Sequence, residues 1–341
     1  MVVLRKKFNT AFVLSLIYLT ACSPKYLEPT DTIQMPELLD SNFRASDGTV
    51  LPMRIWNPPG KKKAVLIALH GFNDYSNFFD APGNFLKTKG VLSYAYDQRG
   101  FAFTKTRGFW PGTSSYVNDF TEFVQLVKKR HGDLPLFVIG ESMGGAITLL
   151  AMTRSNAPSV DGVILSAPAV WGRVSMPWYQ RAALWLGVRL APGMRLTGRG
   201  LKLTPSDNTE MLVALGRDPK VIKETRIDTI HGLVDLMDDA LAVSAKFTKR
   251  ALILYGKRDE IVPVAPTHFM ISKLPPSEKN KQWVALYESG YHMLLRDLQA
   301  EIIWEDIAHW MQRPGEPLPS GAEKKGTALR LKLKNRDKVT Y

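Results

Sequence analysis

The sequence predicts an α/β fold with a mostly parallel sheet and helices on both of its faces. Short apolar runs, typical of buried strands, alternate with segments of helical periodicity through most of the chain. In addition, the pentapeptide Gly140-Glu141-Ser142-Met143-Gly144 stands between one such run and a helical segment, as expected for a serine on a sharp strand-to-helix turn. With 341 residues, 45% hydrophobic and 23% charged, the chain is ordinary for a globular protein and long enough for one large α/β domain or two small ones.

The first elements are expected to be a β-hairpin followed by alternating strands and helices. Residues 43–46 and 49–56 flank the turn sequence Asp47-Gly48, a combination typical of a hairpin. Buried strands are then predicted at 64–69, 91–96, 135–139 and 163–166, and helices near 84–89, 116–130 and 145–154.

The alternation stops after the strand that follows the helix of the serine motif. Residues 167–248 are helix-like and contain several tryptophans and prolines, so we expect an inserted helical cap. Pro177 is expected in the first turn of a helix that reaches Leu186. The core is therefore predicted to comprise 42–166 and 249–313, with further strands at 251–255 and 282–286 and helices at 265–274 and 301–312. Residues 314–341 are expected to be a basic, mostly disordered tail, although 329–333 alternate like a strand.

Residues 1–22 have the features of an export signal. Arg5-Lys6-Lys7 precedes an apolar run, 11–19, that is shorter than the ~20 residues needed to span a bilayer. The run ends in Leu19-Thr20-Ala21-Cys22, which resembles the lipobox of bacterial lipoproteins, whose cysteine is lipidated and becomes the mature N-terminus. We predict a lipid anchor on Cys22, a tether over 23–41 and a place in the cell envelope, with Ser23 favouring the outer membrane over the inner. An ordinary cleaved signal with an incidental cysteine is the alternative.

Basic charge is concentrated at the two ends of the chain. Of the net charge of +13, three units come from residues 5–7 and four from residues 314–341, where seven basic residues outnumber three acidic ones. The middle of the chain has no basic stripe with interleaved aromatic residues, so nucleic acid is not an expected partner. Cys22 is the only cysteine, which excludes an intrachain disulfide.

A serine hydroxyl needs a base to become a nucleophile, usually a histidine oriented by a carboxylate. Among the six histidines, His292 follows the last predicted strand, and Asp259 follows the strand before it. Ser142, Asp259 and His292 thus occur in the chain order, and at the strand ends, that a serine triad on this kind of sheet requires. We predict them to be nucleophile, acid and base, with Glu260 as the alternative acid. This chemistry needs no cofactor and no metal ion.

Two backbone amides are needed to bind the oxyanion that forms when the serine attacks. Met143 follows the serine and is expected to supply one of them. The loop after the strand that ends at Leu69 is expected to supply the other, from Phe72. His70 lies in that loop but precedes the serine in the chain, so we expect a structural role for it.

Five segments together resemble the monoacylglycerol lipase and lysophospholipase branch of the α/β-hydrolases, which also includes serine aminopeptidase-like hydrolases. They are His70-Gly71, 96–100, 140–145, 256–259 and 290–292, and the resemblance extends from about residue 43 to residue 310. It implies the α/β-hydrolase fold with a cap, and a carboxyl-ester hydrolase. One departure is that Asp74 and Tyr75 stand where the family often has a second acid–histidine pair, so the family's usual recognition of a polar head group is not implied for this chain.

The predicted substrate is a monoacyl lipid ester, because large apolar residues cluster over 171–186 of the cap. We assign the acyl pocket to Trp171, Trp178 and Trp185; the alternative is that these side chains only pack the cap onto the sheet. Two other functions remain open, a peptidase or amidase of the same fold and a non-catalytic envelope lipoprotein. The first would need a site for an amino terminus, for which the cap offers the carboxylates of Asp207, Glu210, Asp235, Asp238 and Asp239.

Overall fold

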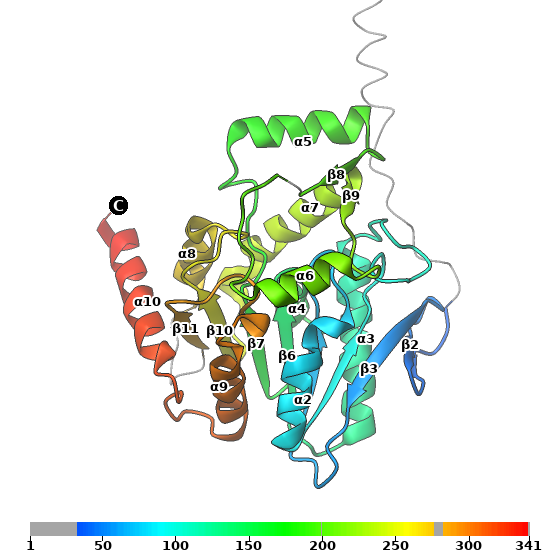
Figure 1. Ribbon diagram of the computed structural model, residues 1–341. Coiled ribbons are helices and arrows are strands. Elements are labelled where there is room, and N and C mark those ends of the chain that lie inside the picture. Colours follow the sequence, from blue (N-terminus) through cyan, green and yellow to red (C-terminus); the bar gives the residue numbers. More distant parts are fainter. Residues whose placement is uncertain (1–32, 199, 276–281, 340–341) are drawn as a thin grey trace, which may run out of the picture.

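The computed structural model describes residues 33–198, 200–275 and 282–339, and its centre is a nine-stranded sheet (Figure 1). The strand order is β1-β2-β3-β5-β4-β6-β7-β10-β11; neighbours from β5 to β11 pair in parallel, whereas β1, β2, β3 and β5 pair antiparallel. The sheet is therefore mostly parallel, and β2 and β3 form the predicted hairpin. The bounds are β1 Glu37–Leu38, β2 Asn42–Arg44, β3 Val50–Trp56, β4 Ala64–Leu69, β5 Val91–Tyr96, β6 Leu136–Glu141, β7 Gly162–Ser166, β10 Ala251–Gly256 and β11 Gln282–Tyr287.

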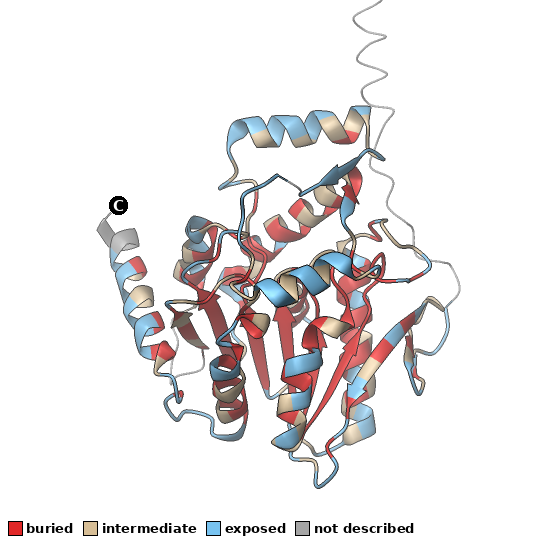
Figure 2. Ribbon diagram, in the orientation of Figure 1, coloured by how far each residue is buried: buried red, intermediate tan, exposed pale blue. Residues whose placement is uncertain are grey.

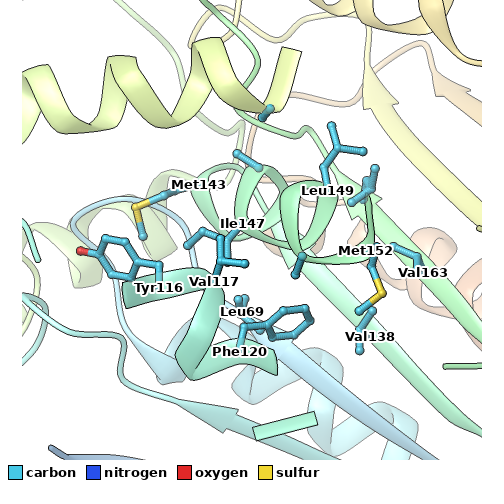
Figure 3. Packing of buried hydrophobic residues seen from close by; sticks show 14 of the residues in the cluster. Leu69, Tyr116, Val117, Phe120, Val138, Met143, Ile147, Leu149, Met152 and Val163 are labelled. Carbon is cyan, nitrogen blue, oxygen red and sulfur yellow. The ribbon is translucent and has the colours of Figure 1, made fainter. Parts of the chain in front are cut away.

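Helices cover both faces of the sheet because its central strands are apolar on both. In β4, Val65 and Ile67 face the core beneath α3, α4 and α8, whereas Leu66 and Ala68 face the core beneath α2 and α9. Figure 3 shows part of the first core, where side chains of α3 and α4 pack over those of β4 and β6. The bounds are α2 Asp80–Thr88, α3 Thr113–His131, α4 Met143–Thr153, α8 Val264–Lys273 and α9 Ala300–Gln312, close to the predicted helices.

The chain between β7 and β10 forms a separate cap. It contains α5 Trp178–Leu190, α6 Thr209–Arg217 and α7 Ile227–Val243, but also an antiparallel pair, β8 Arg195–Thr197 and β9 Glu224–Arg226, that the sequence did not predict. Helix α7 packs on α4, whereas α5 lies outermost (Figure 1). Helix α5 is exposed along most of its length (Figure 2), and Pro177 is its N-cap rather than part of its first turn.

Two predictions for the ends of the chain are wrong. The expected tether, 23–41, includes β1, because Glu37–Leu38 pair with β2 and Leu38 is buried. The expected disordered tail, 314–341, includes helix α10, Ala322–Val339, which packs against the edge strand β11. Helix α10 has only a few buried residues, and many charged residues lie between them. The sequence therefore has the composition of a polar tail although one side of the helix packs against the sheet. The predicted signal peptide and Cys22 lie outside the described residues.

Candidate active site

Ser142 lies on a sharp turn between β6 and α4. Its φ is 52°, a left-handed conformation that a residue with a side chain adopts under strain. The amide of Ser142 donates to the Ser166 carbonyl at 2.9 Å, which ties the turn to the end of β7. A Cβ atom on Gly140 would lie 2.3 Å from the Gly144 carbonyl oxygen, and one on Gly144 would lie 2.4 Å from that of Leu69. Positions 140 and 144 therefore require glycine because there is no room for a Cβ atom, whereas the strained backbone conformation is that of Ser142 itself.

His292 and Asp259 form a buried pair on the loops that follow β11 and β10. The distance from His292 Nδ1 to Asp259 Oδ2 is 2.8 Å, and the Asp259 side chain is completely buried. Asp259 Oδ1 accepts hydrogen bonds from the amides of Ile261 at 2.9 Å and Val262 at 3.0 Å, so the carboxylate has a fixed orientation. Because this carboxylate accepts from Nδ1, the proton of a neutral His292 lies on Nδ1 and Nε2 is the basic nitrogen. The alternative acid, Glu260, instead accepts a backbone hydrogen bond from the cap.

The loop after β4 lies directly against the serine. A Cβ atom on Gly71 would be 3.3 Å from the Cβ of Ser142. His70 supports this loop from below, because its Nδ1 donates to the Gly71 carbonyl at 2.8 Å and its Nε2 accepts from the Gln98 amide at 2.9 Å. Burial lowers the pKa of His70, consistent with a neutral ring that has one donor and one acceptor. The structure thus places His70 as a support of the loop.

The two residues expected to donate to the oxyanion both lie close to the serine. Phe72 follows Gly71 in the loop after β4, and its side chain lines the same cavity as Ser142. Met143 is the first residue of α4, where backbone amides have no partner within the helix. The N-terminus of α4 also directs the positive end of the helix dipole toward the serine.

Ser142 and His292 line one cavity of about 390 Å³ between the core and the cap. Five polar or charged residues line it, namely Asp74, Glu141, Ser142, His292 and Arg296. The remaining walls are apolar: Gly71, Phe72, Ala169, Trp171, Met176, Leu203, Pro205, Ile230, Leu233, Val234, Met237, Ile261, Val262 and Met293. Such a cavity can enclose an apolar chain whose reacting group lies at Ser142.

Of the three tryptophans assigned to the acyl pocket, Trp171 lines the cavity and the other two do not. Trp178 is 77% exposed and Trp185 is 50% exposed, because α5 stands away from the core and buries only Val188. The guanidinium of Arg189 lies 4.1 Å from the ring centroid of Trp185 on this outer surface. The assignment of Trp178 and Trp185 to the pocket is therefore wrong.

Helix α7 forms a cavity wall that the sequence analysis missed. Four of its residues line the cavity, Ile230, Leu233, Val234 and Met237. Their spacing of three, one and three residues is that of one face of a helix. This signal was present in the sequence, but a helical apolar face does not distinguish packing on the core from lining a cavity.

Asp74, Glu141 and Arg296 form a buried ionic cluster that was also missed. Arg296 Nη1 is 2.7 Å from Asp74 Oδ2, and Arg296 Nη2 donates to Glu141 Oε1 at 2.9 Å. Burial alone would lower the pKa of Arg296, but the two carboxylates raise it, so the guanidinium is charged. Burial raises the pKa of Glu141, and Arg296 opposes that shift. The three residues are far apart in the chain, and no local pattern predicts such a contact.

Tyr75, the other departure from the family pattern, contacts the cap. Its hydroxyl donates to Asp218 Oδ2 at 2.7 Å, just after α6. The neighbouring Asn73 donates from its side chain to Thr225 Oγ1 at 2.8 Å. The loop that carries Phe72 is therefore tied to the cap on one side and to Arg296 on the other.

Comparison with known proteins places this geometry in a family. Residues 60–299 match the model described as Hydrolase_4, serine aminopeptidase, S33. The chain belongs to this family. It is 24% identical over 285 residues to the monoacylglycerol lipase of Mycolicibacterium smegmatis, covering 80% of this chain and 96% of that one. It is 25% identical over 285 residues to the human monoglyceride lipase, covering 79% and 88% of the two chains.

Solved structures agree on the fold. A soluble variant of the Saccharomyces cerevisiae monoglyceride lipase superposes with a TM-score of 0.66 at 21% identity, covering 85% of this chain and 98% of that one. The Paleococcus ferrophilus monoacylglycerol lipase gives 0.62 at 21% identity, with coverages of 76% and 98%. The fold is therefore that of the α/β-hydrolases, and together with the S33 family it makes the chain a serine hydrolase. Within the described residues, none of the helices combines the length and the apolar character needed to cross a bilayer.

Proposed function

We propose that this S33-family hydrolase cleaves monoacyl lipid esters, of the monoacylglycerol or lysophospholipid type, through an acyl-enzyme. The observation that carries the proposal is the apolar cavity shared by Ser142 and His292. Curated relatives that cover most of the chain are monoacylglycerol and monoglyceride lipases, which supports an ester of this class.

In the proposed mechanism, Ser142 Oγ attacks the ester carbonyl carbon while His292 Nε2 accepts the hydroxyl proton. Asp259 keeps His292 in the required tautomer and stabilises the imidazolium that forms. The amides of Phe72 and Met143 donate to the oxyanion. His292 then donates its proton to the leaving alcohol as the tetrahedral intermediate collapses. His292 then deprotonates a water molecule that attacks the acyl-enzyme, and it returns this proton to Ser142 Oγ as the fatty acid leaves.

The cavity walls give the acyl chain most of its binding energy. Each methylene buried against apolar surface contributes ~0.8 kcal/mol, which is about a fourfold change in kcat/KM if the contact is made in the transition state. Trp171 and Met176 from the cap and Leu233 from α7 supply such surface. We expect kcat/KM to rise from acetyl to medium-chain esters and to level off where the cavity ends.

A peptidase that recognises a free amino terminus has less support from the same cavity. Of the acids that line it, Asp74 and Glu141 are already paired with Arg296. The cap carboxylates considered for an amino terminus, Asp207, Glu210, Asp235, Asp238 and Asp239, are not among the residues that line it. An unpaired carboxylate near the serine is therefore missing from the described lining.

A panel of esters tests the proposal. Monoacylglycerols, lysophospholipids and simple esters of two to sixteen carbons are assayed beside aminoacyl anilides. We expect monoacyl esters to be cleaved, with the rising and levelling chain-length profile described above. Faster cleavage of an aminoacyl anilide than of any acyl ester, or a flat profile, would transfer the assignment to a peptidase or a general esterase.

We further propose that the enzyme acts at a membrane of the bacterial envelope, preferably the outer one, tethered by a lipid on Cys22. The exposed side of α5 supports an interfacial location, because aromatic and aliphatic side chains occur there beside arginines, a composition typical of interfacial helices. These residues are Trp178, Tyr179, Trp185, Leu186 and Leu190, with Arg181 and Arg189. One acyl chain binds a membrane only marginally, so further chains or surface contacts are needed.

The anchor is tested by mass spectrometry of the mature N-terminus and by fractionation. We expect a lipidated Cys22 at the N-terminus and recovery with membranes, whereas Cys22→Ser remains an unprocessed precursor. A mature N-terminus at any other residue contradicts the anchor without affecting the proposed chemistry.

A further inference from the structure

Arg296 joins the three loops that carry the reacting groups. Asp74 lies two residues after Phe72, Glu141 immediately precedes Ser142, and Arg296 lies four residues after His292. The two ion pairs, at 2.7 Å to Asp74 and 2.9 Å to Glu141, therefore connect the oxyanion loop, the serine turn and the histidine loop through one side chain.

The cluster is buried, and its geometry is set by the planar, forked guanidinium group of Arg296. The side chains of Arg296, Asp74 and Glu141 are 10%, 8% and 3% exposed. Two terminal nitrogens of one guanidinium contact two different carboxylates, so the distance between those carboxylates is set by the width of the fork. A lysine ammonium has the same charge but is a point donor on a flexible stem and lacks this geometry.

Stability alone does not explain the cluster. A buried ion pair is expensive to desolvate, and replacing the whole pair by apolar residues is often neutral or stabilising. Each member of this cluster instead sits next to, or within a turn of, a residue whose position decides catalysis. A displacement of about 1 Å among such groups lowers rates by about a hundredfold.

We propose that Arg296 is a positioning residue that fixes Ser142 and the Phe72 amide relative to His292. The inference rests on the proposed function for the identity of the reacting groups, but it concerns their geometry and not the substrate. By binding Asp74 and Glu141 at the same time, the Arg296 guanidinium fixes the distances between the serine turn, the oxyanion loop and the histidine loop when the transition state forms.

The test makes two kinds of measurement on Arg296→Lys. One is kcat and KM on the best ester; the other is the second-order rate of Ser142 labelling by a small fluorophosphonate. We expect kcat and the labelling rate each to fall tenfold to a hundredfold while KM changes less than threefold, because geometry is lost but the cavity walls remain. The small probe has no alcohol head group for Arg296 to bind, so slow labelling reports on the geometry of the site.

A neutral variant of the whole cluster is also needed, because a single neutral substitution such as Arg296→Met is expected to fold poorly. That change leaves Asp74 and Glu141 buried without a counter-charge, which destabilises the fold strongly. The neutral triple variant Asp74→Asn, Glu141→Gln, Arg296→Gln removes the charges while keeping similar shapes. We expect it to recover thermal stability but to keep the slow labelling of Arg296→Lys, which separates positioning from stability.

Arg99 is a matched control, since it also forms a buried cluster with two carboxylates. It donates to Asp119 and Asp47 but lines no part of the catalytic cavity. Arg99→Lys is expected to lower the unfolding temperature while leaving the labelling rate within twofold of wild type.

The proposal is overturned if Arg296→Lys folds and is labelled at the wild-type rate, or if the variant affects only KM. If wild type is labelled at Ser142 but cleaves no monoacyl ester, the proposed function fails while the inference stands.

Discussion

Ser142 is maintained in its left-handed conformation by its neighbours. Its φ of 52° stores strain of roughly 1–3 kcal/mol, which the surrounding backbone must offset. The close approach of Gly144 to Leu69 and the hydrogen bond to Ser166 supply that constraint. The result is a serine that lines the cavity at the N-terminus of α4.

His70 gives a prediction about pH at the residue scale. Its pKa is lowered by burial below the ordinary value of 6.5, so the unfolded chain binds its proton more readily than the folded one. The stability that neutral His70 contributes is present above pH 6.5 and is lost as the pH falls, by about 1.4 kcal/mol per pH unit at most.

The measurement compares unfolding free energies of wild type and His70→Gln between pH 7.5 and pH 5. We expect the advantage of wild type over the variant to shrink as the pH decreases through this range. An advantage that is constant over the range would show that His70 does not titrate with unfolding.

The site residues that could be predicted from the sequence are those that directly follow a recognisable strand. Asp259 and His292 each follow a strand, and parallel strands end at the same edge of a sheet, so their meeting with Ser142 was foreseeable. Arg296 was not foreseeable in its role. Its partners depend on how the loops pack after the sheet has formed, and a single arginine four residues after His292 gives no sign of that packing.

At the scale of elements, α5 does not have the role that its composition suggested, and α7, for which no role was predicted, lines the cavity. The aromatic helix α5 is exposed, whereas α7 packs on α4 and lines the cavity. Tryptophan content predicts burial only when an element has a surface to pack against, and α5 is separated from the core by α7 and the β8–β9 pair (Figure 1).

If the substrate is the proposed monoacyl ester, this arrangement predicts which cap residues select its acyl chain. Met176→Ala removes apolar surface from the cavity, so we expect kcat/KM for medium-chain esters to fall about tenfold with acetyl esters nearly unchanged. Trp178→Ala is the matched control from the exposed side of α5 and should leave the profile on soluble esters as in wild type. Equal effects of the two changes would contradict the assignment of the cavity walls.

Helix α10 supports the edge of the sheet, and Gly326 allows its close approach. A Cβ atom at Gly326 would lie 1.8 Å from the Val284 carbonyl oxygen of β11. Arg330 also donates to the Gln282 carbonyl at 3.1 Å. Covering an edge strand in this way prevents it from pairing with another chain.

We therefore expect Gly326→Ala to destabilise the protein by roughly 1–3 kcal/mol, although alanine favours helices. Gly216→Ala in α6 is the matched control, because nothing lies within 4 Å of its Cβ position, and it should be neutral or stabilising. The measurement is the thermal unfolding temperature of both variants relative to wild type. A Gly326→Ala protein as stable as wild type would mean that α10 does not pack against β11 as described.

At the scale of the whole molecule, the parallel sheet explains why distant segments form one site. β4, β6, β10 and β11 run in the same direction, so the loops after them leave from one edge and carry Phe72, Ser142, Asp259 and His292 respectively. The strand–helix alternation predicted this sheet well, because buried parallel strands are continuous apolar runs. It did not predict α10 or β1, which are short of apolar residues and depend on contacts with the finished sheet.

The central claim is that Ser142 is a nucleophile activated by His292 and Asp259. The most direct measurement is labelling with a fluorophosphonate, followed by mass spectrometry of the modified peptide. We expect one adduct, on Ser142, with Ser142→Ala unlabelled and inactive and His292→Ala reduced in turnover by several orders of magnitude, since the triad acts as a unit. Labelling that persists in Ser142→Ala, or an adduct on another residue, would contradict the account.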